Sequence, residues 1–184
     1  APIAVNDTTS VTEDNTVVIA VLTNDTDVDN IAEISSSTVA VATQAAFGST
    51  TVNSNGLITY KVNDDYFGSD TFEYTVSDIH GAVSNTASVS INISGNNDAP
   101  RTVNDEATTE EDTSVRVKVL DNDEDIDGSM DITSVALVVM PKNGIVEVQL
   151  DGSVIYTPNK DYFGLDTFTY TVKDTENALS SEAD

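Results

Sequence analysis

Residues 66–78 read YFGSDTFEYTVSD, and residues 162–174 repeat them as YFGLDTFTYTVKD. In each stretch apolar residues alternate with polar ones, beginning at Phe72 and at Phe168. Successive side chains of a β-strand point to opposite faces, so this alternation predicts a half-buried strand. The near-identity of the two stretches predicts that one fold is present twice.

Further matches extend the repeat over the rest of the chain. They are Val5-Asn6-Asp7 with Val103-Asn104-Asp105, Glu13-Asp14 with Glu111-Asp112, Leu22 with Leu120, and Ala1-Pro2 with Ala99-Pro100. A length of 184 residues allows one domain or two. The repeat selects two, residues 1–98 and 99–184. Because the connector 95–100 is short, we expect the two domains to stack end to end.

The first copy contains seven strand-like segments and no convincing helical spacing with caps. The segments are 3–11, 16–22, 32–43, 48–53, 57–62, 71–77 and 83–93. Tight-turn dipeptides stand at Asn55-Gly56 and at Asp151-Gly152. The sequence therefore predicts an all-β chain of two tandem seven-stranded Greek-key β-sandwiches.

The second copy stops within its last strand. Ala183-Asp184 aligns with Ala87-Ser88, so the part of the first copy that contains Val89, Ile91 and Ile93 has no counterpart. This ending, and the match of Ala1-Pro2 to an internal boundary, indicate a fragment of a longer chain. An uncovered sheet edge and core are liabilities in a sandwich. We expect the second domain to be the less stable one, or to borrow a strand from a neighbouring molecule.

Composition limits the partners. The chain has 32 Asp and Glu against 7 Lys and Arg, a formal charge of −25. Nucleic acids and anionic membranes recruit clusters of Lys and Arg, so this charge argues against both and favours cations. A hydrophobic content of 39% favours a folded chain over a disordered one. The lack of cysteine excludes disulfides and thiolate metal sites. No apolar run approaches the roughly 18 residues of a membrane span, and no signal peptide is visible.

An acidic run follows the second predicted strand of each copy. Residues 24–30 read NDTDVDN, and residues 121–128 read DNDEDIDG. Calcium (Ca2+) takes about 6–8 oxygen ligands, and alternating aspartates supply several of them from one short segment. An EF-hand is excluded, because it needs a glutamate at loop position 12, where Ser134 stands, and flanking helices. A solvated acidic loop and a site for magnesium or manganese stay open as alternatives.

If successive strands alternate in direction, the acidic residues gather at the ends of the domains. The candidate calcium ligands at the joint are Glu13, Asp14 and Asp70 of the first copy, Asn97 and Asp98 of the linker, and Asp123, Asp125, Asp127 and Asp174 of the second copy. Candidate half-sites at the free ends are Asp25, Asp27, Asp29 and Asp78, and Glu111, Asp112 and Asp166. Close carboxylates repel each other by about 1 kcal/mol or more per pair even when solvated. A cation would turn that repulsion into a rigid joint.

Several of these residues have a second interpretation. Asp70 and Asp166 are equally well explained as turn residues, because aspartate bonds the backbone just ahead of a strand. The repeated aromatic residues suggest a sugar-stacking platform, but the alternating ones are better explained as core. His80 is the only histidine, and its counterpart is Glu176, which excludes a repeated catalytic role. Paired carboxylates for glycoside hydrolysis lack an evident cleft. We therefore expect no enzymatic activity.

These motifs together resemble the bacterial cadherin-like tandem repeats of large surface adhesins. The shared elements are the linker Asn97-Asp98-Ala99-Pro100, the pattern LxNDxDxDG at 120–128, and YFGxDxFxYxVxD. The resemblance implies cadherin- or immunoglobulin-like sandwiches, secretion to a bacterial surface, calcium binding, and a stalk or adhesive role. Two positions depart from the pattern: Asn30 stands for the glycine at Gly128, and Asn177 for the glycine at Gly81.

Two functions follow as hypotheses. The first is a calcium-rigidified structural or adhesive repeat pair, with neighbouring repeats of the same chain as partners. Its adhesive ligand stays open between a cell-surface glycan, a cell-surface protein and another copy of itself. The second is a carbohydrate-binding module pair of a secreted polysaccharide-degrading enzyme, which would expose coplanar aromatic rings outside the core.

Overall fold

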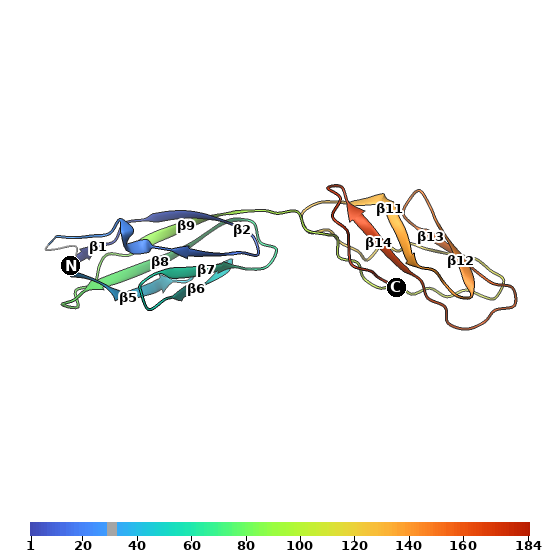
Figure 1. Ribbon diagram of the computed structural model, residues 1–184, viewed down its shortest axis with the longest axis horizontal. Helices are drawn as coiled ribbons and strands as arrows, with labels where there is room; N and C mark the ends of the chain where they lie inside the picture. The colour runs from blue at the N-terminus through green and yellow to red at the C-terminus, as the bar shows by residue number, and fades with distance from the viewer. Residues whose placement is uncertain (29–32) are drawn as a thin grey trace. The chain divides into compact units, whose positions relative to one another are not determined.

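The computed structural model describes residues 1–28 and 33–184 of the chain. It comprises two compact units, Ala1–Asn96 (unit 1) and Asn97–Asp184 (unit 2), which are described one at a time (Figure 1). Both are built of strands, and the helical element in the described part is the short 3-10 turn η1 (Val21–Thr23). The prediction of an all-β chain is therefore confirmed. No helix among the described residues is long and apolar enough to span a bilayer.

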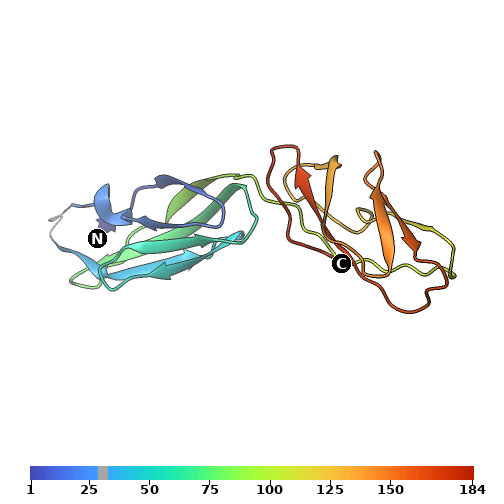
Figure 2. The same ribbon diagram turned by 45° about the vertical axis from the view of Figure 1, so that its right-hand side comes forward.

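Unit 1 contains two main sheets and one short strand pair. Its strands are β1 (Pro2–Ile3), β2 (Asp7–Thr12), β3 (Thr16–Ile19), β4 (Thr26–Asp27), β5 (Ile34–Thr43), β6 (Gly48–Val52), β7 (Ile58–Val62), β8 (Gly68–Asp78) and β9 (Ala87–Ser94). One sheet has the order β2-β9-β8-β5 and the other β3-β7-β6, while β1 pairs with β4 (Figure 2). Strand β9 runs antiparallel to β8 and parallel to β2. It is therefore the strand that joins β2 to the rest of its sheet.

The core of unit 1 lies between these sheets and is dominated by aromatic and β-branched side chains. Tyr60, Phe72 and Tyr74 are at most 1% exposed. Strand β9 contributes Val89 and Ile91, which are equally buried. The alternation read from the sequence of β8 thus corresponds to its buried face, because a strand turns every second side chain inward.

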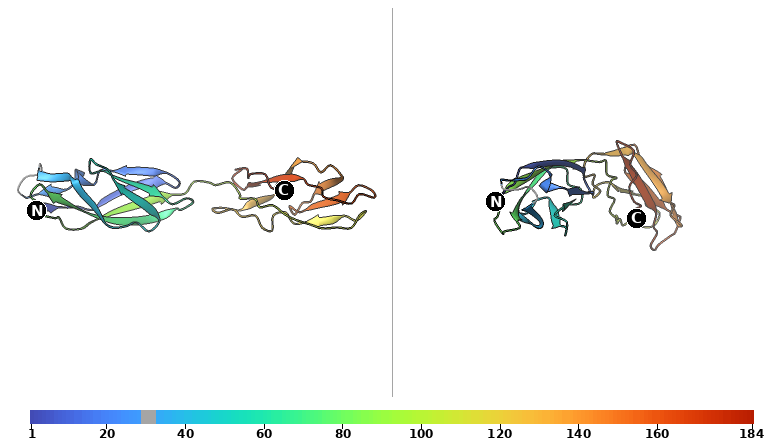
Figure 3. Two further views of the ribbon diagram at one scale, coloured as in Figure 1. Left: turned by 90° about the horizontal axis from the view of Figure 1, so that it is seen from below. Right: turned by 60° about the vertical axis from the view of Figure 1, so that its left-hand side comes forward.

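Unit 2 repeats part of this arrangement. Its strands are β10 (Val115–Val117), β11 (Met130–Val139), β12 (Gly144–Val148), β13 (Val154–Pro158) and β14 (Thr169–Asp174). They form the sheets β10-β13-β12 and β11-β14 (Figure 3). A core of Val119, Val154, Tyr170 and Val172 is essentially inaccessible to solvent. In the alignment of the two copies, the strands β10 to β14 correspond to β3, β5, β6, β7 and β8, and the core residues of unit 2 correspond to core residues of unit 1.

The expected strand bounds in unit 1 need three adjustments. The segment 3–11 is divided into β1 and β2. The segment 83–93 becomes a strand only from Ala87. Just before it, the Asn85 side chain accepts a hydrogen bond from Ala4 N (3.0 Å) and donates one to Ala4 O (2.8 Å). The start of the segment 32–43 lies outside the described residues, and β5 begins at Ile34.

Unit 2 has fewer strands than the sequence predicted. It lacks a counterpart of β9, as expected from the alignment of Ala183-Asp184. It also lacks a counterpart of β2, because residues 105–110 form no strand, and this corrects the expectation of six complete strands. The reason is visible in unit 1, where every ladder partner of β2 belongs to β9. A strand without a partner has no hydrogen bonds to hold it extended.

Candidate metal centre

A buried tyrosine organises one end of unit 1. The Tyr74 hydroxyl lies 2.9 Å from the carbonyl oxygen of Val21 and 2.9 Å from Oδ1 of Asp25. The same Oδ1 accepts a hydrogen bond of 2.8 Å from the backbone N–H of Val5. Asp25 is only 3% exposed. The alternating acidic run therefore begins with a carboxylate that is anchored inside the unit.

The remaining oxygens of this cluster lack partners. Oδ2 of Asp25 and Oδ2 of Asp7 are both buried without a hydrogen bond. Burial raises the pKa of both carboxyl groups, and the nearby charge of Asp25 further raises the pKa of Asp7. A buried carboxylate oxygen without a partner is costly unless a cation or proton compensates it. This pair of oxygens fits the donor chemistry of a hard divalent cation.

Asp27 and Asp78 present a second pair of carboxylates in unit 1. Their Oδ2 atoms lie 3.9 Å and 3.7 Å from the backbone nitrogen of Ala1, so both carboxylates approach the same point. Oδ1 of Asp78 accepts backbone N–H bonds of 2.9 Å from His80 and Ala82. The bond from Ala82 is the largest cause that holds the pKa of Asp78 below its usual value. Hydrogen bonds from the backbone thus favour the ionised form of Asp78. The predicted ligand Asp29 lies outside the described residues.

Glu13 and Asp14 follow β2 in unit 1. Glu13 is 2% exposed. Its Oε1 accepts a short hydrogen bond from the backbone N–H of Asn96, and its own N–H donates to Ser94 O at 3.0 Å. Asp14 adopts a positive φ of 60°. Its Oδ1 accepts the N–H of Asp65 at 3.0 Å. Glu13 therefore binds the backbone at the last residue of the unit.

Asp70 is engaged inside unit 1. Its two oxygens accept four hydrogen bonds of 2.8–3.0 Å, from Ala46 N, Phe47 N, Tyr60 OH and Thr71 N. These bonds favour the turn interpretation of Asp70 over the ligand interpretation. Asp166 repeats the arrangement in unit 2. Burial alone would raise its pKa, but the hydrogen bonds that it accepts lower the pKa on balance.

Unit 2 rebuilds the tyrosine cluster from matching residues. The Tyr170 hydroxyl lies 2.9 Å from Oδ2 of Asp123 and 3.2 Å from Oδ2 of Asp105. Oδ1 of Asp123 accepts the N–H of Val103 at 2.8 Å. Burial raises the pKa of both aspartates, as in unit 1. Asp7 and Asp105 were not among the predicted ligands, although the repeated Val-Asn-Asp motif marked both positions.

Hydrogen bonds link two pairs of predicted ligands in unit 2. Asn97 donates its amide N–H to Oδ2 of Asp174 at 2.6 Å. The N–H of Asp98 donates to Oδ2 of Asp127 at 3.2 Å. These contacts attach the first two residues of unit 2 to the acidic run and to the end of β14.

Asp125 is the middle member of that acidic run. Its Oδ1 accepts the N–H of Gly128 at 3.0 Å, while its Oδ2 is buried without a hydrogen bond. Burial raises its pKa, and the neighbouring carboxyl of Asp127 adds to the shift. Unit 2 thus also contains a buried carboxylate oxygen that a cation would satisfy.

His80, the remaining titratable candidate, lies at the surface. Its side chain is 71% exposed and its Nε2 is 3.6 Å from Oε2 of Glu33. This position matches the surface-loop interpretation that the sequence favoured over catalysis.

Comparison with known protein families divides the chain at nearly the same place as the fold. A model described as a bacterial cadherin-like domain matches residues 1–95, and one described as a bacterial Ig domain matches residues 97–183. No curated protein sequence matches the chain.

Solved structures give the fold alone. Drosophila N-cadherin EC1-4 is 17% identical with a TM-score of 0.54, over 98% of this chain and 47% of that one. The chain therefore spans about half the length of that cadherin fragment. An endo-fucoidan hydrolase from glycoside hydrolase family 107 is 13% identical over 99% of this chain and 28% of that one, with a TM-score of 0.39. The Bacteroides ovatus protein SGBP-B, solved with a mixed-linkage heptasaccharide, is 14% identical over 99% of this chain and 42% of that one, with a TM-score of 0.31.

Proposed function

The chain belongs to the bacterial cadherin-like family, and from this premise we propose that it is a calcium-binding pair of structural repeats from an extracellular bacterial surface adhesin. The observation that carries the proposal is the buried carboxylate oxygen without a hydrogen bond, found at Asp25 in unit 1 and at Asp125 in unit 2. Calcium is the natural partner, because it accepts many oxygen ligands in flexible geometry. Magnesium rarely uses a cage made entirely of protein ligands.

The residues that would hold calcium differ between the two units. In unit 1 they are Asp7, Asp25, Asp27 and Asp78, with Asp29 as a further candidate. In unit 2 they are Asn97, Asp98, Asp123, Asp125, Asp127 and Asp174, with Asp105 beside Asp123. Burial raises the pKa values of five of these carboxylates, Asp7, Asp25, Asp105, Asp123 and Asp125. Bound calcium would supply positive charge to them and so remove a cost that the folded chain otherwise carries.

We further propose that calcium stiffens the joint between the repeats. Glu13 binds the N–H of Asn96 within unit 1. Asn97 binds Asp174, and Asp98 binds Asp127, within unit 2. The peptide bond between Asn96 and Asn97 therefore joins two residues that are each hydrogen-bonded to an acidic side chain of their own unit. Calcium shared by Glu13, Asp14 and the ligands of unit 2 would restrict rotation about this short link.

A calcium titration tests the proposal. Calorimetry should detect binding with dissociation constants of about 10⁻⁴ to 10⁻³ M, typical of extracellular modules. The melting temperature should rise, and small-angle scattering should report a stiffer molecule. Asp125→Asn should remove most of the stiffening, whereas Asp27→Asn should leave it and weaken binding only in unit 1. The matched control is Asp131→Asn, an acidic residue outside both sets. No heat and no change in dimensions up to tens of millimolar calcium would refute the proposal.

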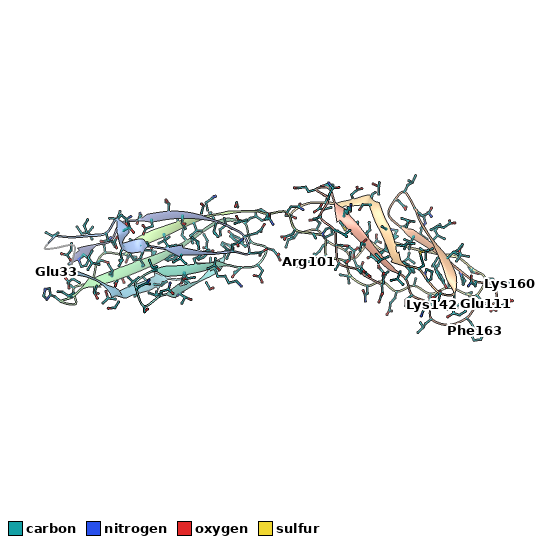
Figure 4. All side chains as sticks on the ribbon, in the orientation of Figure 1. Glu33, Arg101, Glu111, Lys142, Lys160 and Phe163 are labelled. Atoms are coloured by element: carbon teal, nitrogen blue, oxygen red, sulfur yellow. The ribbon has the colours of Figure 1, made fainter. Side chains whose placement is uncertain are left out.

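Carbohydrate binding is the second candidate, and exposed aromatic rings are the observation that supports it. Phe67 is 51% exposed and Phe163 is 86% exposed, at matching turns of the two units; Figure 4 labels Phe163 at one end of unit 2. Phe47 stacks on Tyr66 with ring centroids 4.1 Å apart. Binding on a glycan array that Phe163→Ala abolishes, while calcium binding persists, would favour this candidate. No catalytic role is proposed for either unit.

A further inference from the structure

Two edge strands of unit 2 carry exposed apolar side chains. Among the described residues, β11 is hydrogen-bonded only to β14, and β12 only to β13 (Figure 1). The exposed apolar residues on these two strands and on the turns that follow them, between 47% and 92% exposed, are Ile132, Val138, Val139, Met140, Ile145 and Leu150. We call this set the β11–β12 patch. Large apolar patches on a protein surface mark interaction sites.

The β11–β12 patch is continuous along this side of unit 2. The short connection 140–143 joins the end of β11 to the start of β12, which keeps Met140 close to Ile145. At the other end, a Cβ added at Gly152 would lie 3.1 Å from the carbonyl oxygen of Ile132, so the turn after β12 lies against the start of β11. Leu150 belongs to that turn. The apolar side chains therefore follow both edge strands from one end to the other.

Unit 1 has the same edge but different residues on it. The matching positions, all of them exposed, are Ser36, Ala42, Thr43, Gln44, Ser49 and Ser54. Strand β5 lies at the edge of its sheet although unit 1 contains β9, because β9 pairs on the other side of β8. The open edge is thus a property of the fold, whereas its apolar character is particular to unit 2. Folding does not explain that character, since unit 1 folds with smaller and mostly polar residues there.

Opposite charges bound the strand part of the patch. Residues 132–141 contain no charged side chain, while Asp131 comes directly before them and Lys142 directly after them. The matching positions in unit 1 are Ser35 and Ala46, which carry no charge. Unit 2 therefore differs from unit 1 both in the apolar residues of this edge and in the two charges at its ends.

Both bounding charges are available to a partner. The Thr133 hydroxyl donates to Oδ1 of Asp131 at 2.6 Å and is the largest cause that lowers the pKa of Asp131, which favours its ionised form. The ammonium group of Lys142, labelled in Figure 4, forms no ion pair within the described part of the chain. By contrast, Lys118 and Lys160 lie 3.5 Å and 3.4 Å from aspartate oxygens.

These charges select one arrangement of two such strands. When two copies of β11 lie antiparallel with residues 132–141 in register, Asp131 of each chain faces Lys142 of the other. A parallel arrangement would place like charges opposite each other, which is unfavourable. The charge of −25 opposes association through most of the surface, but residues 132–141 contain no acidic side chain. The side of β11 that lacks a neighbouring strand can accept a further one.

We propose that the β11–β12 patch is the contact between two copies of this chain, with their β11 strands paired antiparallel about a two-fold axis. Such a contact uses the same surface on both copies and closes as a dimer. The apolar side chains bury one another, while Asp131 and Lys142 fix the register. The contact gives the adhesive role a partner, and in that respect it rests on the proposed function. The association itself involves none of the proposed calcium ligands.

Analytical ultracentrifugation of the full chain over a concentration series, in EDTA, tests the contact without calcium. It should show a reversible equilibrium between monomer and dimer. Val139→Thr combined with Met140→Gln installs the residues of unit 1 at exposed positions and should raise the dissociation constant at least about tenfold. The matched control is Leu165→Ser, which replaces a leucine outside the patch, 94% exposed, by the residue that unit 1 has at Ser69. It should change the dissociation constant by less than about twofold. Equal melting temperatures show that the variants stay folded.

Charge reversal tests the antiparallel register. Asp131→Lys and Lys142→Asp should each weaken dimerisation about fivefold or more, because each places like charges opposite each other at both ends of the contact. The double variant should return to within about twofold of the wild type, since it exchanges the two charges and restores both pairs. Hydrogen exchange in β11 should slow as the concentration of the wild-type chain rises.

Several results would overturn the proposal. They are a chain that stays monomeric up to about 1 mM, complexes larger than a dimer, a double variant as weak as the single ones, and association that appears only when calcium is added. A dimer that persists in EDTA while the calcium titration shows no binding would refute the proposed function and support this contact. Calcium binding by a chain that never dimerises would refute the contact alone.

Discussion

The strands β8 and β14 have nearly the same sequence but differ in length. Strand β8 covers Gly68–Asp78, whereas β14 covers only Thr169–Asp174. The part of β8 that has no strand counterpart in unit 2 is residues 68–72, which correspond to residues 164–168. In unit 1, residues 68–72 pair with β9. Nearly identical local sequence therefore gives a strand only where a neighbour supplies the hydrogen bonds. Strand formation here depends on tertiary pairing more than on intrinsic preference.

The tyrosine clusters show the opposite behaviour. Tyr74 contacts Asp25 and Tyr170 contacts the matching residue Asp123, at 2.9 Å in both units. Their partners come from segments that both units retain. The tyrosine cluster therefore forms with or without β9, whereas the length of β8 and β14 depends on that strand.

The largest difference is expected when a core phenylalanine is removed. Phe72→Ala in unit 1 should cost about 3–5 kcal/mol, because Phe72 is fully packed, while Phe168→Ala should cost about half as much or less. Hydrogen exchange, followed separately in β8 and β14, measures the opening free energy of each unit. The exposed Thr71→Ala and Thr167→Ala serve as controls and should stay within about 0.5 kcal/mol of wild type. Equal losses for the two phenylalanines would show that Phe168 is packed as tightly as Phe72.

Removing the buried hydroxyl should affect both units alike. Tyr74→Phe and Tyr170→Phe should each cost about 1.5–3 kcal/mol in EDTA, because each deletes a hydrogen bond to a carboxylate. The same exchange measurement applies. Tyr66→Phe, whose hydroxyl bonds the backbone of Ser69 at 3.0 Å in an exposed turn, is the control and should cost about 1 kcal/mol or less. A markedly smaller loss at Tyr170 would mean that its cluster also depends on β9.

The turns after β8 and β14 share a backbone conformation but have different residues at the position with positive φ. Gly81 has φ 85° and Asn177 has φ 76°, and nothing lies within 4 Å of a Cβ added at Gly81. Gly81→Val should therefore cost about 1–2 kcal/mol through backbone strain alone, and Gly81→Asn less than about 1 kcal/mol. Chemical denaturation of each variant measures the cost. A Gly81→Asn loss as large as that of valine would show that the two turns are not equivalent.

The smallest effect concerns pH at the tight turns. Asp151 accepts a hydrogen bond of 2.6 Å from the Ser153 hydroxyl, the largest cause that lowers its pKa below 3.8. Its counterpart in unit 1 is Asn55, which does not titrate. A lowered pKa in the folded state stabilises the fold above pH 3.8, and this contribution is lost as pH falls through the folded pKa.

Carboxyl chemical shifts in an NMR titration should place the Asp151 midpoint below 3.8, and Ser153→Ala should move it upward. Unit 2 alone should lose stability at this turn below that pH. A midpoint that Ser153→Ala leaves unchanged would contradict the assignment.

Much of the fold was predictable because it is encoded by local pattern. The alternation of Phe72, Tyr74 and Val76 follows directly from the pleat of a strand, and the same residues proved to be buried. The loss of β9 from unit 2 followed from the alignment of Asp184 with Ser88. The loss of the β2 counterpart did not, because residues 105–110 keep a strand-like sequence and lack only a partner.

The candidate site was predictable in part for the same reason. Acidic residues at alternate positions mark candidate oxygen ligands by their chemistry, and strand direction assigns them to the ends of a domain. The sequence did not distinguish Asp70, whose oxygens accept four hydrogen bonds, from Asp25, which keeps one oxygen buried and unpaired. Asp7 was not predicted as a ligand either, because its position in an expected strand did not distinguish it from other strand residues.

By itself the sequence determined the repeat, the all-β class, the acidic character and the positions of the candidate oxygen ligands. These depend on composition and on spacing along the chain, which the fold does not alter. Only the tertiary structure decided which carboxylates lose water and which gain hydrogen bonds, and which strands form at all. Each of these depends on a partner far away in the sequence.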